Sequence, residues 1–160
     1  MTERGHSIAG LPRNASHAQV RQTLAWADAG WPWAHYGPVV MAAVREGVPV
    51  VGDNLPRAQM RAAMQDSTLD ARLPAPQLAE QEARIRTGHC NALPGSQIRP
   101  MTRVLIARGL AMADTVTGAR QPGRGVLLVA GNGHVAHGLG VPVHLGPDIQ
   151  VKVLSAQAAP

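Results

Sequence analysis

Aromatic residues, cysteine and lysine are scarce in this chain, and these scarcities limit the kinds of site that it can form. The sequence has no phenylalanine, three tryptophans and one tyrosine. Its one cysteine, Cys90, excludes an intrachain disulfide and a cysteine-rich metal site, and leaves the redox compartment open. Because Lys152 is the only lysine, the positive charge comes almost wholly from arginine, whose planar fork suits carboxylate and phosphate groups.

Nucleic acid is not expected as a partner, and no transmembrane segment is expected. The net charge is +5, but the arginines are dispersed and few aromatic rings are present to stack on bases. Residues 125–147 carry no formal charge, yet Gly, Pro, His and Asn interrupt them too often for a transmembrane segment. Residues 1–17 lack the pattern of a secretory signal, which predicts a cytoplasmic protein as written. A start codon further upstream would predict a membrane-anchored or exported one.

The chain length suits one compact domain with an apolar core. We predict a flexible lead-in over residues 1–17, a single domain over residues 18–155 and a tail over residues 156–160. Hydrophobic spacing and Gly or Pro boundaries predict helices that alternate with short apolar runs. The predicted helices cover residues 17–29, 38–46, 56–65, 77–87 and 97–117, the last with Ser96 as N-cap.

The apolar runs predict the fold class. Residues 48–51, 126–130 and 149–154 have the length of strands, and helices separate them in sequence. This alternation predicts an α/β domain with a short, mostly parallel sheet flanked by helices. Three strands are few for such a sheet, so either a strand is missing or a partner covers an edge.

The best candidate for chemistry lies after the central predicted strand. Gly131 and Gly133 would let the backbone turn sharply there and approach a ligand closely. Ligands of open α/β sheets sit beyond the carboxyl ends of strands. His134 is therefore placed to ligate a metal, although it could equally lock the turn through a hydrogen bond to a neighbouring carbonyl.

Three segments together resemble the ChaN-like haem-binding uptake family of the Tiki superfamily. They are WADAGWPWAHYGPVVMAAVREGVPVVGDNLPR, then HCNALP with the helix ending ARGLAMA, then LLVAGNGHVAHGLGVPVHL. The resemblance implies an α/β fold and haem binding for iron uptake. It also implies that two chains sandwich the ligand, which would make the protein a homodimer. Other members of the superfamily are metal-dependent hydrolases with two Gly-x-x-His motifs.

The chain departs from that family pattern. Residues 1–25 contain neither the expected first strand nor its histidine motif, so the resemblance is to an incomplete ChaN-like domain. Leu105 and Gly109 stand where the family usually has Gln and Asp, and Ala136 and Gly138 stand where it has Arg and Asp. Several polar groups that could hold a ligand or metal are therefore absent.

The predicted cofactor-binding residues follow from the turn and from the resemblance. Tyr36 and His134 are the candidate iron ligands, because phenolate and imidazole both bind haem iron. The other predicted contacts are Asn132, Gly133, Arg108, Trp33 and His89. For most of them an ordinary structural role is the alternative.

These structural alternatives are specific. Tyr36 could pack with Trp33 and Trp31, a cluster that stacks on a porphyrin or clamps two helices. Arg108 could pair with a haem propionate or with an internal carboxylate. His89 borders the predicted crevice, and its neighbour Cys90 is predicted to be a small buried apolar residue.

Haem binding, in haem or iron uptake, is the function that the sequence predicts. It requires no covalent catalysis, so we do not expect an enzyme. Two alternatives stay open. One is a metal-dependent hydrolase in which His134 holds a cation that activates water, and the other is a truncated domain without activity.

Overall fold

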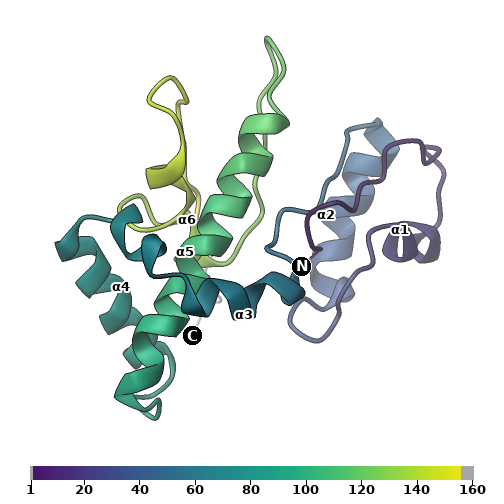
Figure 1. Ribbon diagram of the computed structural model, residues 1–160. Coiled ribbons are helices and arrows are strands. Elements are labelled where there is room, and N and C mark those ends of the chain that lie inside the picture. Colours follow the sequence, from purple (N-terminus) through teal and green to yellow (C-terminus); the bar gives the residue numbers. More distant parts are fainter. Residues whose placement is uncertain (1, 156–160) are drawn as a thin grey trace. The chain divides into compact units, whose positions relative to one another are not determined.

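The computed structural model describes residues 2–155, and the predicted tail over residues 156–160 lies outside them. The chain divides into two compact units, residues 1–56 (unit 1) and 57–160 (unit 2). Unit 1 contains α1 (His17–Thr23) and α2 (Trp33–Glu46) (Figure 1). Unit 2 contains α3 (Arg57–Gln65), the 3-10 helix η1 (Ser67–Arg72), α4 (Ala75–Gly88), α5 (Gly95–Gly118), α6 (Asn132–Val135) and the 3-10 helix η2 (Val141–His144).

The prediction of an α/β domain with a parallel sheet is wrong. The structure is mostly helical, with 53% helix and 3% strand, and the described residues form no sheet. The β-type pairing among residues 2–155 consists of two isolated bridges, Glu3 with Asn54 and Ser7 with Val51. These bridges join the start of unit 1 to its end, and among the described residues neither bridge extends into a pair of strands.

The three predicted strands are extended chain without regular pairing. Residues 124–131 turn back after α5 and run alongside it (Figure 1). Leu127 is 81% exposed, so this apolar run is not the buried central strand that we predicted. Residues 149–154 likewise form no strand, and Val48 and Val51 are exposed.

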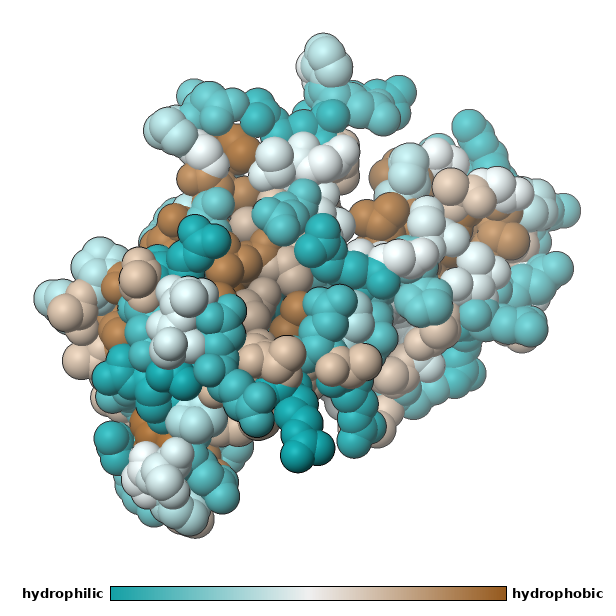
Figure 2. Space-filling view, viewed as in Figure 1, coloured by the Kyte–Doolittle hydropathy of each residue, from teal (hydrophilic) through white to brown (hydrophobic). Residues whose placement is uncertain are grey.

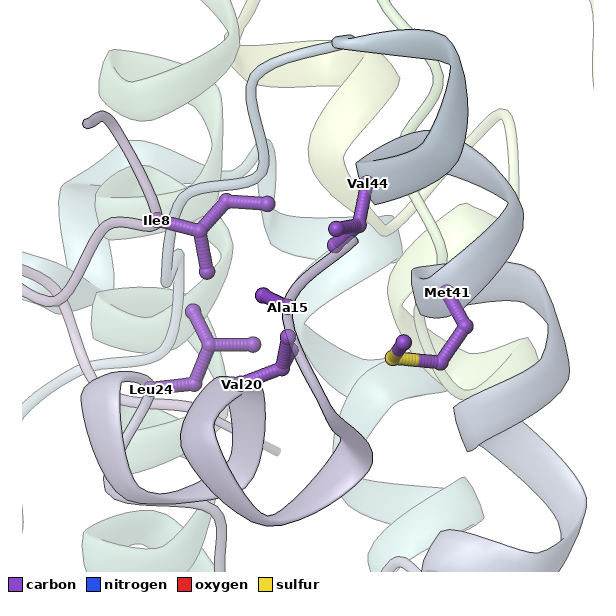
Figure 3. Packing of buried hydrophobic residues seen from close by; sticks show 6 residues of the cluster. All are labelled: Ile8, Ala15, Val20, Leu24, Met41 and Val44. Atoms are coloured by element: carbon purple, nitrogen blue, oxygen red, sulfur yellow. The ribbon is translucent and has the colours of Figure 1, made fainter. Parts of the chain in front are cut away.

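Unit 1 is held by a small apolar core between α1 and α2. Figure 3 shows its side chains pointing toward one another. The core includes Ile8 and Ala15, which belong to the predicted lead-in, and both are buried. Its members are Ile8, Ala15, Val20, Leu24, Met41 and Val44.

Both helices of unit 1 have boundaries with clear physical causes. Ser16 caps α1, since its hydroxyl accepts from the Gln19 backbone while the Gln19 side chain accepts from the Ser16 N–H. α1 ends at Thr23, short of the predicted residue 29. α2 begins before the predicted start, contains Pro38 and ends at Glu46, and its C-cap is Gly47, whose φ of 68° suits a residue without a Cβ.

Unit 2 is built around α5, which packs against α3, α4, η1 and η2. None of the residues of α5 from Ile98 to Ala113 is exposed, and Met112 and Thr102 are fully inaccessible. The prediction of this helix from its apolar spacing is confirmed, but its N-cap is Pro94 rather than Ser96. α3 and α4 also form close to their predicted bounds.

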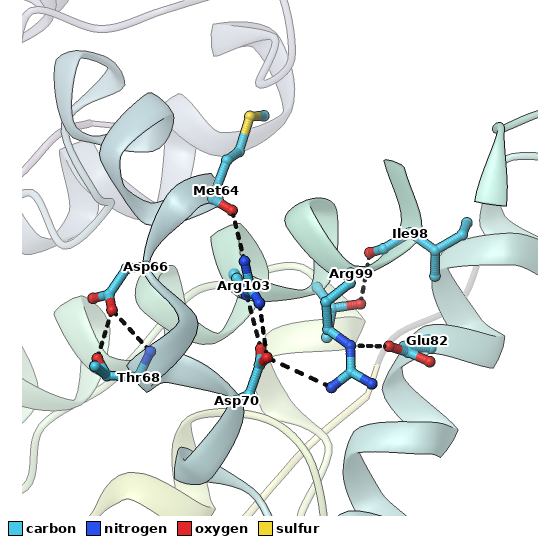
Figure 4. A network of polar contacts seen from close by, with 9 residues as sticks. Met64, Asp66, Thr68, Asp70, Glu82, Ile98, Arg99 and Arg103 are labelled. Atoms are coloured by element: carbon cyan, nitrogen blue, oxygen red, sulfur yellow. Dashed lines mark hydrogen bonds and ion pairs between the residues drawn. The ribbon is translucent and has the colours of Figure 1, made fainter. Parts of the chain in front are cut away.

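A polar network ties the helices of unit 2 together (Figure 4). The Arg103 guanidinium donates to both carboxylate oxygens of Asp70, at 2.9 and 2.8 Å, and to the Met64 carbonyl at 3.2 Å. Arg99 lies 2.5 Å from Glu82 and 3.8 Å from Asp70. The bonds from Arg103 lower the pKa of Asp70, so this carboxylate stays charged and links η1 to α5.

Apolar side chains also reach the surface, and the space-filling view shows them among hydrophilic residues (Figure 2). The most exposed are Leu127 and Leu154, each more than four-fifths accessible. Within residues 2–155, none of the helices has both the length and the apolar character needed to cross a membrane.

Candidate functional site

The aromatic residues of unit 1 form one cluster, which we call the aromatic cluster: Trp26, Trp31, Trp33 and Tyr36. The Tyr36 ring lies 4.3 Å from the Trp31 ring and 6.4 Å from the Trp26 ring, measured between centroids. Trp26 and Trp33 pack edge to face at 5.0 Å. The Trp26 indole N–H donates to the Trp31 carbonyl at 2.8 Å, which fixes the two residues relative to each other.

Polar contacts hold Trp33 in this cluster. Asp28 accepts from the Trp33 backbone N–H at 2.9 Å and pairs with Arg21. The first of these bonds, together with Arg21, lowers the pKa of Asp28. The Trp33 indole donates to Nδ1 of His17 at 3.0 Å, and the Arg21 guanidinium lies 5.8 Å from the Trp33 ring. Trp33 is thus anchored on both sides, a role that the sequence did not reveal.

Tyr36 lies on α2 one turn from this anchor. Trp33 leans over Gly37, where an added Cβ would lie 2.6 Å from the indole ring. Tyr36 is half-buried, and its hydroxyl makes no hydrogen bond to another described residue. Its neighbour His35 is exposed. The cluster therefore presents one phenol whose oxygen is not engaged by the part of the chain that the structure describes.

His134 lies in unit 2, on the short helix α6. It is 6% exposed, and burial, assisted by the positive charge of Arg108, lowers its pKa to about 4. The imidazole is therefore neutral near pH 7 and keeps a nitrogen lone pair, as a metal ligand must. Of the residues predicted to act together, Arg108 and His134 do lie within electrostatic reach of each other.

The glycines around His134 do not have the role that we predicted for them. The residues form α6 rather than a tight turn after a strand. Neither Gly131 nor Gly133 has a positive φ, and an added Cβ would meet nothing within 4 Å at either. The tight position is Gly140, where a Cβ would lie 2.2 Å from the His134 carbonyl oxygen. Asn132 and Gly133 are exposed.

A second histidine borders α5 close to Arg108. The His144 ring packs over Gly109, where an added Cβ would lie 3.2 Å from it. Its Nε2 is buried without a hydrogen-bond partner among the described residues. Burial, and secondarily the charge of Arg72, lowers the pKa of His144. Two imidazoles with lowered pKa values thus lie in the part of unit 2 around α5.

The remaining candidates lie at the surface. His89 is exposed after α4, where its backbone N–H donates to the Ile85 and Arg86 carbonyls at 3.2 Å. Cys90 is also exposed and has a φ of 53°, so the prediction of a buried apolar cysteine is wrong. Within residues 2–155, no three His, Cys, Asp or Glu side chains come together as a metal site would require, which leaves the hydrolase alternative without a ligand cluster there.

Comparison with known proteins identifies the family. The model of the haem-binding uptake family ChaN, of the Tiki superfamily, matches residues 7–145. No curated protein and no solved structure matched the chain. The match covers most of the sequence and confirms the resemblance seen in its three motifs. This chain therefore belongs to the ChaN family of haem-binding uptake proteins.

Proposed function

We propose that this chain binds haem, with the Tyr36 phenolate as the iron ligand and the aromatic cluster as the surface that the porphyrin contacts. The observation that carries the proposal is the state of Tyr36. Its ring is held 4.3 Å from Trp31, while its hydroxyl makes no hydrogen bond within the described residues. Family membership supports haem as the ligand, and phenolate is an established haem ligand in proteins.

Packing of the cluster suits this role. The anchoring of Trp33 by Asp28 and His17 keeps α2 and the preceding loop in place before haem arrives. A ligand site that is already formed loses less conformational entropy on binding than one that must be ordered. Flat aromatic rings also offer large apolar area with few rotatable bonds.

His134 is the second candidate ligand. Its protonation state favours iron ligation, whereas its burial opposes it. A neutral imidazole is favoured by its pKa of about 4. However, the residue is only 6% exposed, so iron could reach its ring only after α6 moved. Tyr36 needs no such movement, which is why we rank it first. Of the other predicted contacts, Arg108 lies within electrostatic reach of His134 and would accompany haem bound there.

Haem titration of the full chain tests the proposal through three single variants. We expect Tyr36→Phe to weaken binding and to remove the phenolate-to-iron charge-transfer band, because it deletes only the ligand oxygen. His35→Ala is the matched control, since it removes an exposed imidazole from the next position of the same helix. His134→Ala tests the second candidate. Wild-type spectra and affinity in Tyr36→Phe would eliminate Tyr36 as the ligand.

Two further readouts separate the remaining alternatives. Size-exclusion chromatography with and without haem tests the predicted homodimer. A folded wild-type chain that shows no saturable Soret shift would favour the truncated domain without activity and refute the proposal.

A further inference from the structure

Unit 2 contains a cavity that none of the predicted site residues lines. It has a volume of about 410 Å³, within the usual range for small-molecule sites. It lies between the C-terminal end of α5, the extended residues 124–128, η2 and residues 148–154. Two of the three apolar runs that we predicted as strands, residues 126–130 and 149–154, therefore contribute to its walls.

The walls are mainly apolar, and they offer no ligand for haem iron. Valine and leucine side chains from five separate stretches of unit 2 face the cavity. No His, Tyr, Cys or Met is among the lining residues, so haem iron would find no protein ligand there. The principal apolar members are Val116, Val126, Leu128, Val135, Val141 and Leu145.

The charged residues of the lining are predominantly positive. Arg120, Arg124 and Lys152 line the cavity, and Asp148 is the only acidic residue among them. Asp148 is paired with Arg120 at 2.8 Å, and this bond lowers its pKa. Neither Arg124 nor Lys152 has an ion pair with a described residue. Two positive charges at an apolar cavity thus have no compensating carboxylate among residues 2–155.

We propose that this cavity binds a free acyl-chain carboxylate, with the chain in the apolar interior and the carboxylate at Arg124 and Lys152. Charge complementarity selects the anion, and a carboxylate accepts hydrogen bonds from both side chains. Removal of methylene groups from water supplies most of the affinity. The site is independent of Tyr36 and of the proposed haem function.

Isothermal titration calorimetry of the full chain with dodecanoate, below its micelle concentration, tests the proposal. We expect saturable binding of one dodecanoate per chain, with decanoate binding about tenfold more weakly because it is two methylenes shorter. Dodecyltrimethylammonium has the same chain length and the opposite charge, and it should not bind measurably. Equal binding of the cationic and anionic amphiphiles would overturn the proposal.

Variants locate the binding. The double variant Arg124→Gln and Lys152→Gln should weaken dodecanoate binding by about five- to tenfold, as expected for two solvent-accessible charge contacts. Arg86→Gln, an exposed arginine on α4 outside the cavity lining, is the matched control and should bind as the wild type does. Val126→Trp fills the cavity from a residue that is 40% exposed, so it should abolish binding while circular dichroism stays unchanged. Wild-type affinity in both lining variants would refute the site.

Discussion

Burial of His134 predicts that unit 2 loses stability in mildly acidic solution. The group has an unfolded pKa near 6.5 and a folded pKa of about 4. Well above pH 6.5 the imidazole is neutral in both states and contributes no pH dependence. As the pH falls toward about 4, the unfolded chain takes up the proton and the folded chain does not, so unfolding becomes more favourable.

The size of this effect follows from the shift. A change of 2.5 pKa units corresponds to a total loss of about 3 kcal/mol once the pH is below both values. Between about pH 7.5 and about pH 5, the free energy of unfolding should fall by about 2 kcal/mol. Solvent screens the electrostatic effect on His134 only weakly, because the residue is only 6% exposed. The carboxyl groups with lowered pKa values, such as Asp70, lose their contribution mainly below this window.

Hydrogen exchange of peptides from α5, measured at the two pH values and corrected for intrinsic rates, reports this change directly. His134→Gln removes the titrating group, so its stability should vary with pH by about 2 kcal/mol less than that of the wild type. The comparison also cancels the contribution of His144, which has the same sign. His137→Gln, at an exposed position of the same segment, is the matched control. The same pH dependence in wild type and His134→Gln would refute the reasoning.

Two further predictions concern packing in unit 2, and thermal or urea unfolding checks both. Gly140→Ala should destabilise the protein by about 1–3 kcal/mol, because its Cβ would meet the His134 carbonyl, whereas Gly133→Ala should change stability by less than about 1 kcal/mol. Equal stability of the two variants would contradict this assignment. Met112→Ala should cost about 2–5 kcal/mol at a fully buried position, and Leu127→Ala, at an 81% exposed one, less than about 0.5 kcal/mol. A large loss in Leu127→Ala would show that residues 126–130 are buried after all.

The helices were predictable because their signals are local. Apolar residues at helical spacing marked α3 and α5, and Gly47 marked the end of α2. The largest errors lie at the end of α1, which is Thr23 and not the predicted residue 29, and at the start of α2. Pro38 predicts the first turn of a helix, but α2 begins at Trp33 and continues through Pro38. Neighbouring turns and packing offset the missing N–H of one proline, and sequence spacing does not reveal that compensation.

The sheet was not predictable because strand pairing is not local. Residues 126–130 have the composition of a buried strand, but a strand needs a neighbouring strand and cover on both faces. Among the described residues this run has neither, and Leu127 faces solvent. The amino-acid composition of a segment indicates that it could form a strand, but it does not show whether a second strand lies beside it. The small number of predicted strands was the one sign in the sequence that partners were lacking.

The same distinction between local and non-local information applies to the candidate sites. The sequence located the aromatic residues, since they are so few, but the helix predicted over residues 38–46 left out Trp33 and Tyr36, which lie one turn apart on α2. It could not show that His17 accepts from Trp33 across sixteen residues, nor that residues from five stretches enclose a cavity. His134 was identifiable from its place in the sequence, but the prediction that Gly131 and Gly133 form a tight turn beside it is wrong. Gly140 is the position that must lack a side chain, because the chain folds back there onto the His134 carbonyl.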